Sequence, residues 1–285
     1  MTSSVDRNPS AATHASTIHD QFTRQAESFA ASPALHNEQA LTLLVDAAAP
    51  SPHETTLDVA CGPGSVVAAF ALRVNRAIGL DATEAMLVEA RKLAASRGLT
   101  NVKFRCGDVY ALPFAAESFD VVSCRFAFHH FEEPQAAFAE MLRVCRVGGR
   151  IVVCDGLASD DPEKAVALNR MERRRDPSTV EFRTLGYLAG LFTAAGLPTP
   201  AERFYRVPAE RDRLIAGSFP ADDAPPHDRR IRGRRPARHA VAPRRRHRAA
   251  LLPFRHPYRD APPLRRNGEP WQSAATALTR RAPIG

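Results

Sequence analysis

The segment Leu57-Asp-Val-Ala-Cys-Gly-Pro-Gly-Ser65 decides the fold class of this chain. A short β-branched and apolar run, residues 55–60, leads into two glycines, and a helical pattern follows over residues 65–72. A buried strand that ends in a glycine turn before a helix is typical of the first unit of a doubly wound α/β sheet. Gly62 and Gly64 let the backbone approach a ligand closely, because a Cβ atom there would collide with it. The segment therefore predicts a ligand site at the carboxyl end of this strand.

The sequence on either side of the turn repeats the alternation of strand and helix. Further strands are predicted at residues 77–80, 102–105, 119–124, 150–154 and 203–207, with helical patterns between most of them. This rhythm indicates a mostly parallel sheet with helices on both faces. We expect an α/β, Rossmann-like, doubly wound domain over residues 20–219, and a disordered leader over residues 1–19, which are small and polar.

Three carboxylates lie near the carboxyl ends of the first three predicted strands. Asp58 lies just before the glycine turn, Asp81 ends the second strand, and Asp108 follows the third. An acid at the end of the second strand is placed to accept hydrogen bonds from a ribose diol, as it does in dinucleotide and nucleoside sites. Asp108 can accept a hydrogen bond from an adenine amine, with Val109 beside it offering a backbone amide and an apolar contact. The three carboxylates predict a nucleoside site.

Asp58 separates two kinds of nucleoside ligand. The pyrophosphate of NAD would rest over the glycine turn, where a nearby carboxylate would repel it by a few kcal/mol. A ligand with a sulfonium and an ammonium group, and no phosphate, would instead be attracted. The dinucleotide fingerprint also requires glycine or alanine at position 67, where Val67 stands. An NAD-dependent oxidoreductase nevertheless stays an alternative.

Composition limits the location of the protein and its other ligands. The five cysteines contain no CxxC pair, which favours reduced thiols over a disulfide framework or a zinc site. The sequence has no basic start followed by an apolar stretch and no apolar run of about 18 residues, so we expect neither a signal peptide nor a membrane span. A cytoplasmic protein without a metal is the expectation; the oligomeric state is left open.

Five segments carry a family resemblance by their order along the chain. They are residues 58–64 (Asp-Val-Ala-Cys-Gly-Pro-Gly), 79–86, 106–114 (Cys-Gly-Asp-Val-Tyr-Ala-Leu-Pro-Phe), 119–130 and 147–150 (Val-Gly-Gly-Arg). In this order they resemble class I S-adenosylmethionine-dependent methyltransferases, and most of all the branch that is similar to the ubiquinone and menaquinone biosynthesis enzymes. The resemblance covers residues 22 to 218 and implies a seven-stranded sheet that binds S-adenosylmethionine.

The resemblance also implies roles for single residues. Asp58 and the turn around Gly62 and Gly64 would hold the methionine part, and Asp81 the ribose. The remaining cofactor-binding residues are Ala60, which stands where the family often has glycine, Ala82 and Met86 near the adenine, Asp108 and Val109 at its edge, and Arg125, which would line the cofactor through its backbone.

Methyl transfer to a small-molecule acceptor depends mainly on proximity and alignment. A base is needed chiefly when the acceptor is a hydroxyl group, and His129 and His130, after the fourth predicted strand, are the candidate catalytic residues. Phe22, Gln25 and Phe29, in a predicted N-terminal helix, are expected to form a lid over cofactor and substrate.

Residues 220–285 differ in composition from the rest of the chain. Residues 221–285 contain 16 arginines, no lysine and five acids, whereas residues 1–220 have a slight excess of acids. One interpretation is a disordered basic arm that binds nucleic acid, which would make the chain a non-catalytic binding protein. The other is a GC-rich gene translated out of frame after about residue 222, for which the other two reading frames of the coding DNA are the test.

The second interpretation bears on the sheet. The last strand of this family is antiparallel and lies between the fifth and sixth strands, so its loss would leave backbone groups unpaired. Residues 249–254 are the one apolar patch able to replace it, but Pro253 argues against a central strand. We therefore expect the C-terminal strand to be missing or replaced by a disordered tail.

Overall fold

The computed structural model describes residues 9–208 and 246–255. Five parallel strands form the centre of one sheet, in the spatial order β3-β2-β1-β4-β5. Their bounds are β1 (Thr55–Val59), β2 (Arg76–Asp81), β3 (Val102–Cys106), β4 (Phe119–Arg125) and β5 (Cys145–Gly156). These strands coincide with predicted ones, which confirms the α/β, Rossmann-like fold.

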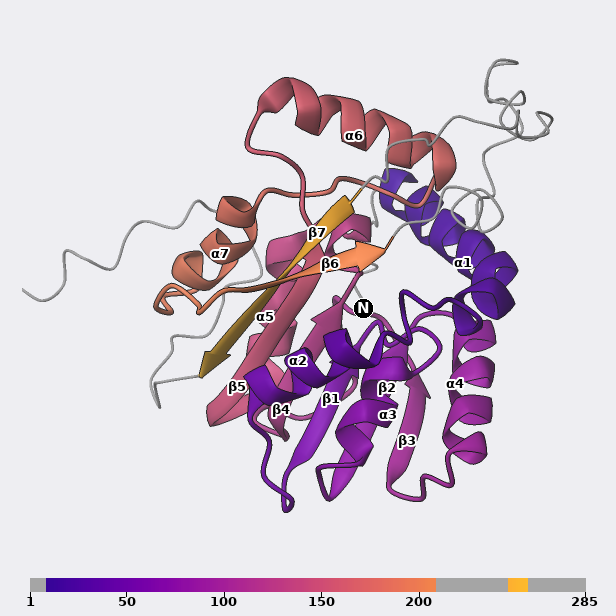
Figure 1. Ribbon diagram of the computed structural model, residues 1–285, viewed down its shortest axis with the longest axis vertical. Helices are drawn as coiled ribbons and strands as arrows, with labels where there is room; N and C mark the ends of the chain where they lie inside the picture. Colours follow the sequence, from indigo (N-terminus) through magenta and orange to yellow (C-terminus); the bar gives the residue numbers. More distant parts are fainter. Residues whose placement is uncertain (1–8, 209–245, 256–285) are drawn as a thin grey trace, which may run out of the picture.

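Helices cover both faces of this sheet (Figure 1). In chain order they are α1 (Pro9–Ala30), α2 (Glu38–Ala48), α3 (Ser65–Ala71), α4 (Glu84–Ser96), the 3₁₀ helix η1 (Phe128–His130), α5 (Pro134–Val144), α6 (Pro162–Arg175) and α7 (Leu185–Ala194). The apolar sides of α2 and α3 form one buried core with the sheet, and those of α5 and α7 form a second. Helices on both faces explain why nearly every residue of β1 and β4 is buried. Across the described ranges, none of the helices combines the length and apolar composition that crossing a bilayer requires.

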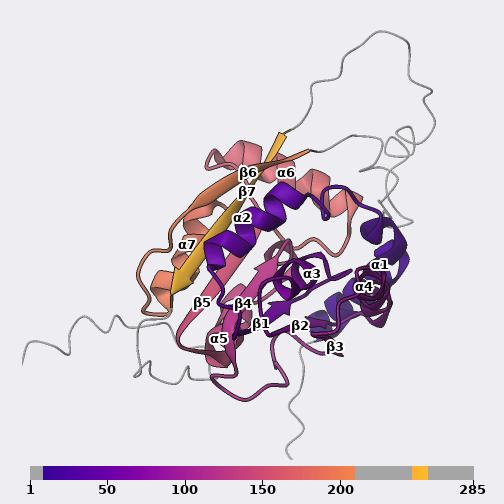
Figure 2. The same cartoon turned by 60° about the horizontal axis from the view of Figure 1, so that its bottom comes forward.

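Two antiparallel strands continue the sheet beyond β5. β7 (Arg246–Arg255) pairs with β5 on one side and with β6 (Arg203–Pro208) on the other. Both views show β7 running beside β5 (Figures 1 and 2). Leu252 of β7 is fully buried and belongs to the core that α5 and α7 cover.

The argument from Pro253 against this strand is wrong for the described chain. Pro253 pairs with Val152 of β5, whereas the pairing of β7 with β6 ends at Leu251. At Pro253 the strand therefore has a neighbour on one side only, and proline, which lacks a backbone N–H, is tolerated at such an edge position. The point at which β6 ends, opposite Leu251, therefore allows a proline at position 253 of β7.

Part of each end that was expected to be disordered lies in a described element. α1 begins at Pro9, so residues 9–19 of the predicted leader are helical, and residues 246–255 of the predicted tail form β7. Residues 1–8, 209–245 and 256–285 lie outside the described part of the chain. The composition of the leader did not reveal the helix because alanine, serine, threonine and histidine carry no strong apolar period.

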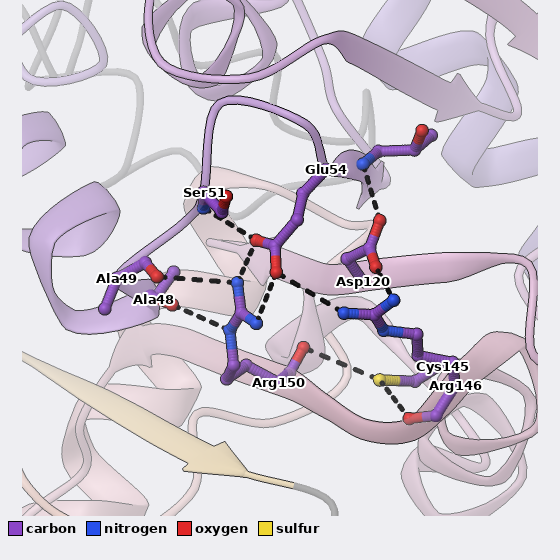
Figure 3. A network of polar contacts seen from close by, with 9 residues as sticks. Ala48, Ala49, Ser51, Glu54, Asp120, Cys145, Arg146 and Arg150 are labelled. Atoms are coloured by element: carbon purple, nitrogen blue, oxygen red, sulfur yellow. Dashed lines mark hydrogen bonds and ion pairs between the residues drawn. The ribbon is translucent and has the colours of Figure 1, made fainter.

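A network of ion pairs joins the amino-terminal ends of the central strands (Figure 3). Arg150 of β5 donates to both carboxylate oxygens of Glu54, with Nη1 at 2.8 Å from Oε1, and its Nε donates to the carbonyl of Ala48 at 2.9 Å. Asp120 accepts a hydrogen bond from the Thr55 amide and an ion pair from Arg146. Burial alone would raise the pKa of Glu54, but the contacts with Arg150, the Ser51 amide and Arg146 together outweigh it and lower the pKa. The network fixes the end of α2 to β1, β4 and β5, at the edge of the sheet opposite its carboxyl ends.

Candidate functional site

A cavity of about 620 Å³ lies at the carboxyl ends of β1, β2 and β4, under α1. This edge of a parallel sheet is where α/β proteins bind their ligands, and the volume lies in the range of about 300–1,000 Å³ that is usual for small-molecule sites. Among the residues that line it, twelve belong to the predicted site: Asp58, Ala60, Gly62, Asp81, Ala82, Met86, Asp108, Val109, Arg125, Phe22, Phe29 and His130. The three predicted carboxylates thus reach one cavity.

The glycine turn between β1 and α3 adopts a backbone that favours glycine. Gly62 has a φ of +50° and Gly64 a φ of +82°. Ala60 also has a positive φ, +54°, which gives a physical reason why glycine is common at this position in related turns. Gly64 does not line the cavity, contrary to its predicted contact with a ligand. A Cβ atom at Gly64 would lie 2.9 Å from the Cβ of Ala90, so this glycine allows the turn to pack closely against α4.

Asp81 connects the glycine turn to the start of α4. Its Oδ2 accepts a hydrogen bond from the Gly62 amide at 2.8 Å, and its Oδ1 accepts one from the Thr83 amide at 2.9 Å. Burial raises the pKa of Asp81 to about 6, against the lowering effect of these amide hydrogen bonds. The carboxylate is held in one orientation and keeps lone pairs for a ligand hydroxyl.

Asp58 lies deeper in the cavity, at the end of β1. Its Oδ1 accepts a hydrogen bond from the Ser123 hydroxyl at 2.7 Å. Burial raises the pKa of Asp58 to about 7, although Ser123 and the nearby charge of Arg125 act in the opposite direction. A cationic ligand group beside Asp58 would offset this cost of burial and favour the carboxylate.

Asp108 lies at the exposed side of the cavity, after β3. Its Oδ1 accepts a hydrogen bond from the Tyr110 amide at 2.9 Å, which fixes a tight turn. Val109 and, from α4, Met86 line the same part of the cavity. This arrangement offers an acceptor and two apolar surfaces to a flat ring.

Arg125 uses its side chain where a backbone contact was predicted. Its guanidinium donates to the carbonyls of Ala34 and Leu35 at 3.1 and 3.0 Å and to the Tyr205 hydroxyl at 3.3 Å. It also lies over the ring of Phe126, 4.5 Å from the centroid. Arg125 therefore ties the loop between α1 and α2 to β4 and β6 at the wall of the cavity.

The two candidate catalytic histidines point to different places. His130 lines the cavity, but His129 does not. The Nδ1 and the amide of His129 both contact the carboxylate of Asp155 at 2.8 Å, and its ring stacks on Phe182 with centroids 4.2 Å apart. His129 is therefore held by Asp155 and Phe182 and does not line the cavity, and its catalytic role stays a prediction.

Two of the three predicted lid residues line the cavity, and the lid itself stays a prediction. Phe22 and Phe29 of α1 line the cavity, whereas Gln25 is fully buried and its amide contacts Gln21 and Asp176. Sequence reasoning missed His14 and Ile18, which also line the cavity. The spacing of residues 14, 18, 22 and 29 places them on one helix face and was a readable signal.

The charge of the lining is mainly negative. Asp58, Asp81, Asp108 and Glu132 line the cavity, and Arg125 is the one lysine or arginine among the described lining residues. In the described ranges, no group of three or more histidine, cysteine, aspartate or glutamate residues is arranged to hold a metal ion. The cavity suits a cationic or neutral ligand better than a phosphate.

Comparisons with known proteins point to one family. Residues 57–153 match the model of a methyltransferase domain. The uncharacterised methyltransferase YcgJ of Bacillus subtilis is 33% identical over 202 residues, which are 70% of this chain and 80% of that protein. The ubiquinone/menaquinone biosynthesis C-methyltransferase UbiE of Roseobacter denitrificans is 39% identical over 115 residues. These residues are 39% of this chain and only 46% of that protein.

Solved structures agree with these relatives. The crystal structure of YcgJ from Bacillus subtilis has a TM-score of 0.65 at 28% identity and covers 77% of this chain and 99% of that one. The crystal structure of a putative methyltransferase from Bacillus halodurans has a TM-score of 0.67 at 26% identity. The match covers 77% of this chain and 100% of that one. The methyltransferase domain match over residues 57–153 includes the carboxyl ends of β1, β2 and β4, which border the cavity.

Proposed function

Because this chain belongs to the class I S-adenosylmethionine-dependent methyltransferases, we propose that it methylates a small-molecule acceptor bound in the apolar part of the cavity under α1. The protein is an enzyme of S-adenosylmethionine-dependent methyl transfer. The observation that carries the proposed acceptor site is the shared cavity, in which carboxylates line one part and residues of α1 such as Ile18 and Phe22 line another.

The cavity fits the cofactor on physical grounds. Asp58 is a buried carboxylate whose charged form needs a cation beside it, and the turn at Gly62 leaves room for a ligand at the backbone. We propose that Asp58 and the turn hold the methionine part, Asp81 the ribose, and Asp108 with Val109 and Met86 the adenine. When bound, S-adenosylmethionine supplies an activated methyl group on a sulfonium. The residues around it orient the ligands and exclude water, which is the main requirement of this reaction.

Both alternatives have lost support. An NAD-dependent oxidoreductase would place a pyrophosphate beside Asp58, at an unfavourable cost. A non-catalytic nucleic-acid-binding protein would act through the basic tail, most of which lies outside the described residues. Membership in the methyltransferase family supports neither.

A turnover assay tests the proposed acceptor class. Incubation with labelled S-adenosylmethionine and a panel of quinols, phenols and amines should transfer methyl to at least one neutral aromatic acceptor. The matched controls are a protein substrate and an RNA substrate, which should stay unlabelled. Labelling of the macromolecules alone would contradict a small-molecule acceptor.

The raised pKa of Asp58 predicts a pH-dependent affinity for S-adenosylmethionine. Since burial raises this pKa to about 7, most of the carboxyl is protonated at pH 6 and ionised at pH 8. A ligand cation binds the ionised form, so affinity should fall by roughly 5- to 10-fold as the pH falls from 8 to 6. Calorimetric titration measures this, and Asp58→Asn should lose most of the pH dependence. An equal slope in the variant would contradict the role of Asp58.

We also propose that β6 and β7 complete the seven-stranded sheet of the family. The buried side chain of Leu252 and the pairing of β7 with both neighbours support this. Amide hydrogen exchange followed by mass spectrometry should show a peptide over residues 246–255 protected to a degree similar to β5. Exchange of this peptide at the rate of an unstructured chain would contradict the proposal and leave an out-of-frame tail as the better interpretation.

A cytoplasmic location is part of the same proposal. The five cysteines, all in the described part of the chain, form no disulfide. Burial raises the pKa values of Cys61 and Cys124, so these thiols are unreactive and persist as thiols in a reducing compartment.

A further inference from the structure

The hydrogen bonds of His130 fix which of its two ring nitrogens carries the proton. Nδ1 lies 3.0 Å from the backbone carbonyl of Ser178. A carbonyl oxygen can only accept, so Nδ1 carries the proton and donates it to this contact. Burial lowers the pKa of His130, with a further contribution from the neighbouring His129, so the ring is neutral. In this tautomer Nε2 has a lone pair and no proton.

A short chain of polar groups holds that tautomer. The Ser178 hydroxyl donates to Oδ1 of Asp176 and turns a lone pair toward Nδ1 of His130, at 3.2 Å. Asp176 also accepts a hydrogen bond from the Ser178 amide at 3.0 Å and one from Gln25 of α1 at 3.4 Å. The hydrogen bonds that Asp176 accepts from the hydroxyl and the amide of Ser178, together with the nearby charge of Arg175, favour its carboxylate form. The ring of His130 cannot rotate without breaking this chain.

Aromatic contacts hold the ring on its other sides. The edge of Phe22 meets the ring of His130 with centroids 4.9 Å apart, and the ring of His129 lies at 4.0 Å. Nε2 has no hydrogen-bond partner among the residues that the structure describes, while the residue lines the cavity together with Ile18 and Phe131. A neutral acceptor nitrogen is therefore free to accept a hydrogen bond in a largely apolar wall of the cavity.

The charges around this wall exclude an anionic ligand. The side chain of Arg125 is engaged by Ala34, Leu35 and Tyr205 and is not available to a phosphate or carboxylate at the His130 wall. Glu132, near His130 along the chain, also lines the cavity and adds a negative charge. The wall therefore suits an uncharged group that can donate a hydrogen bond.

We propose that His130 selects the methyl acceptor, with Nε2 accepting a hydrogen bond from a hydroxyl group of an uncharged, largely apolar molecule that lies against Ile18, Phe22 and Phe131. This inference rests on the proposed function, since it concerns the acceptor part of the same cavity. In it His130 contacts the substrate, and Ser178 and Asp176 are positioning residues that keep Nε2 free of a proton.

Two fragments of equal shape test the inference. p-Cresol and p-xylene differ by a hydroxyl in place of a methyl group, and each is titrated into the full-length protein saturated with S-adenosylhomocysteine, with binding followed by NMR. We expect p-cresol to bind about 5- to 10-fold more tightly than p-xylene, because only p-cresol pairs with Nε2. In His130→Phe the preference should vanish, and in His130→Gln, which restores an acceptor, it should partly return. Equal binding of both fragments to the wild type, or binding of neither, would overturn the inference.

A second measurement does not depend on a variant that folds. The ¹⁵N shifts of the His130 ring in the wild-type protein should show a protonated Nδ1 and a bare Nε2, and addition of p-cresol should shift the Nε2 signal. A proton on Nε2 in the free protein would overturn the inference. Failure of S-adenosylhomocysteine to bind would count against the proposed function itself, whereas binding of it without fragment selectivity would count only against the role of His130.

Discussion

Asp81→Ala weakens the binding of S-adenosylhomocysteine by roughly 5- to 150-fold, about 1 to 3 kcal/mol, in a calorimetric titration at pH 7.5. The carboxylate accepts hydrogen bonds from the amides of Gly62 and Thr83, and we assign it the ribose hydroxyls as well. Removing it leaves donors of the protein and of the ligand unpaired in a buried site, which costs this much free energy. The glycine turn also loses the contact that aligns it with β2.

A matched variant separates this local effect from a change in net charge. Glu84 carries the same charge at the start of α4, but its side chain is exposed, pairs with Arg91 and does not line the cavity. Glu84→Ala should therefore leave the affinity within about twofold of wild type. If the Asp81→Ala protein folded and bound the ligand as tightly as wild type, the assigned contact between Asp81 and the ribose would be wrong.

Gly64→Ala lowers the free energy of unfolding by about 2 to 5 kcal/mol, measured by urea denaturation. The added Cβ would lie 2.9 Å from the Cβ and 3.2 Å from the Cα of Ala90, so the turn must move away from α4. The φ of +82° adds the strain of a left-handed conformation, about 1 to 2 kcal/mol, to an overpacking cost of about 1 to 3 kcal/mol. Because the turn borders the cavity, ligand affinity should fall as well.

Gly98→Ala is the control that isolates the steric part. Gly98 has a φ of +64°, yet a Cβ there meets nothing within 4 Å. Its substitution should cost only the conformational part, about 1 to 2 kcal/mol, and leave ligand affinity unchanged. If Gly64→Ala and Gly98→Ala lowered the free energy of unfolding equally, close packing of the turn against α4 would not explain the glycine at position 64.

The central part of the fold could be predicted because local and global signals agree there. Each of β1 to β5 contains apolar or β-branched residues in a segment bounded by turn residues, and the carboxyl ends of parallel strands must meet at one edge. Asp58, Asp81 and Asp108 therefore had to lie near one another once the strand order was known. The order β3-β2-β1-β4-β5 comes from the structure, because the family resemblance supplied only the place of the last strand and periodicity does not contain the order.

The parts that failed depend on contacts distant in the sequence. Whether His129 or His130 faces the cavity is decided by Asp155 and Ser178, 26 and 48 residues away, and two adjacent histidines carry no local sign of this. The place of Pro253 in β7 depends on where β6 ends, which the tail does not encode. At Gly64 the sequence analysis expected a Cβ atom to collide with a ligand. In the structure, such a Cβ would instead collide with Ala90.

Calorimetric titration of the wild-type protein with S-adenosylhomocysteine and with NAD, side by side, tests most directly whether this acidic glycine-turn cavity is built for a phosphate-free nucleoside. We predict saturable binding of S-adenosylhomocysteine, weakened in Asp81→Ala, and no measurable heat with NAD. Saturable binding of NAD, with none of S-adenosylhomocysteine, would contradict the account.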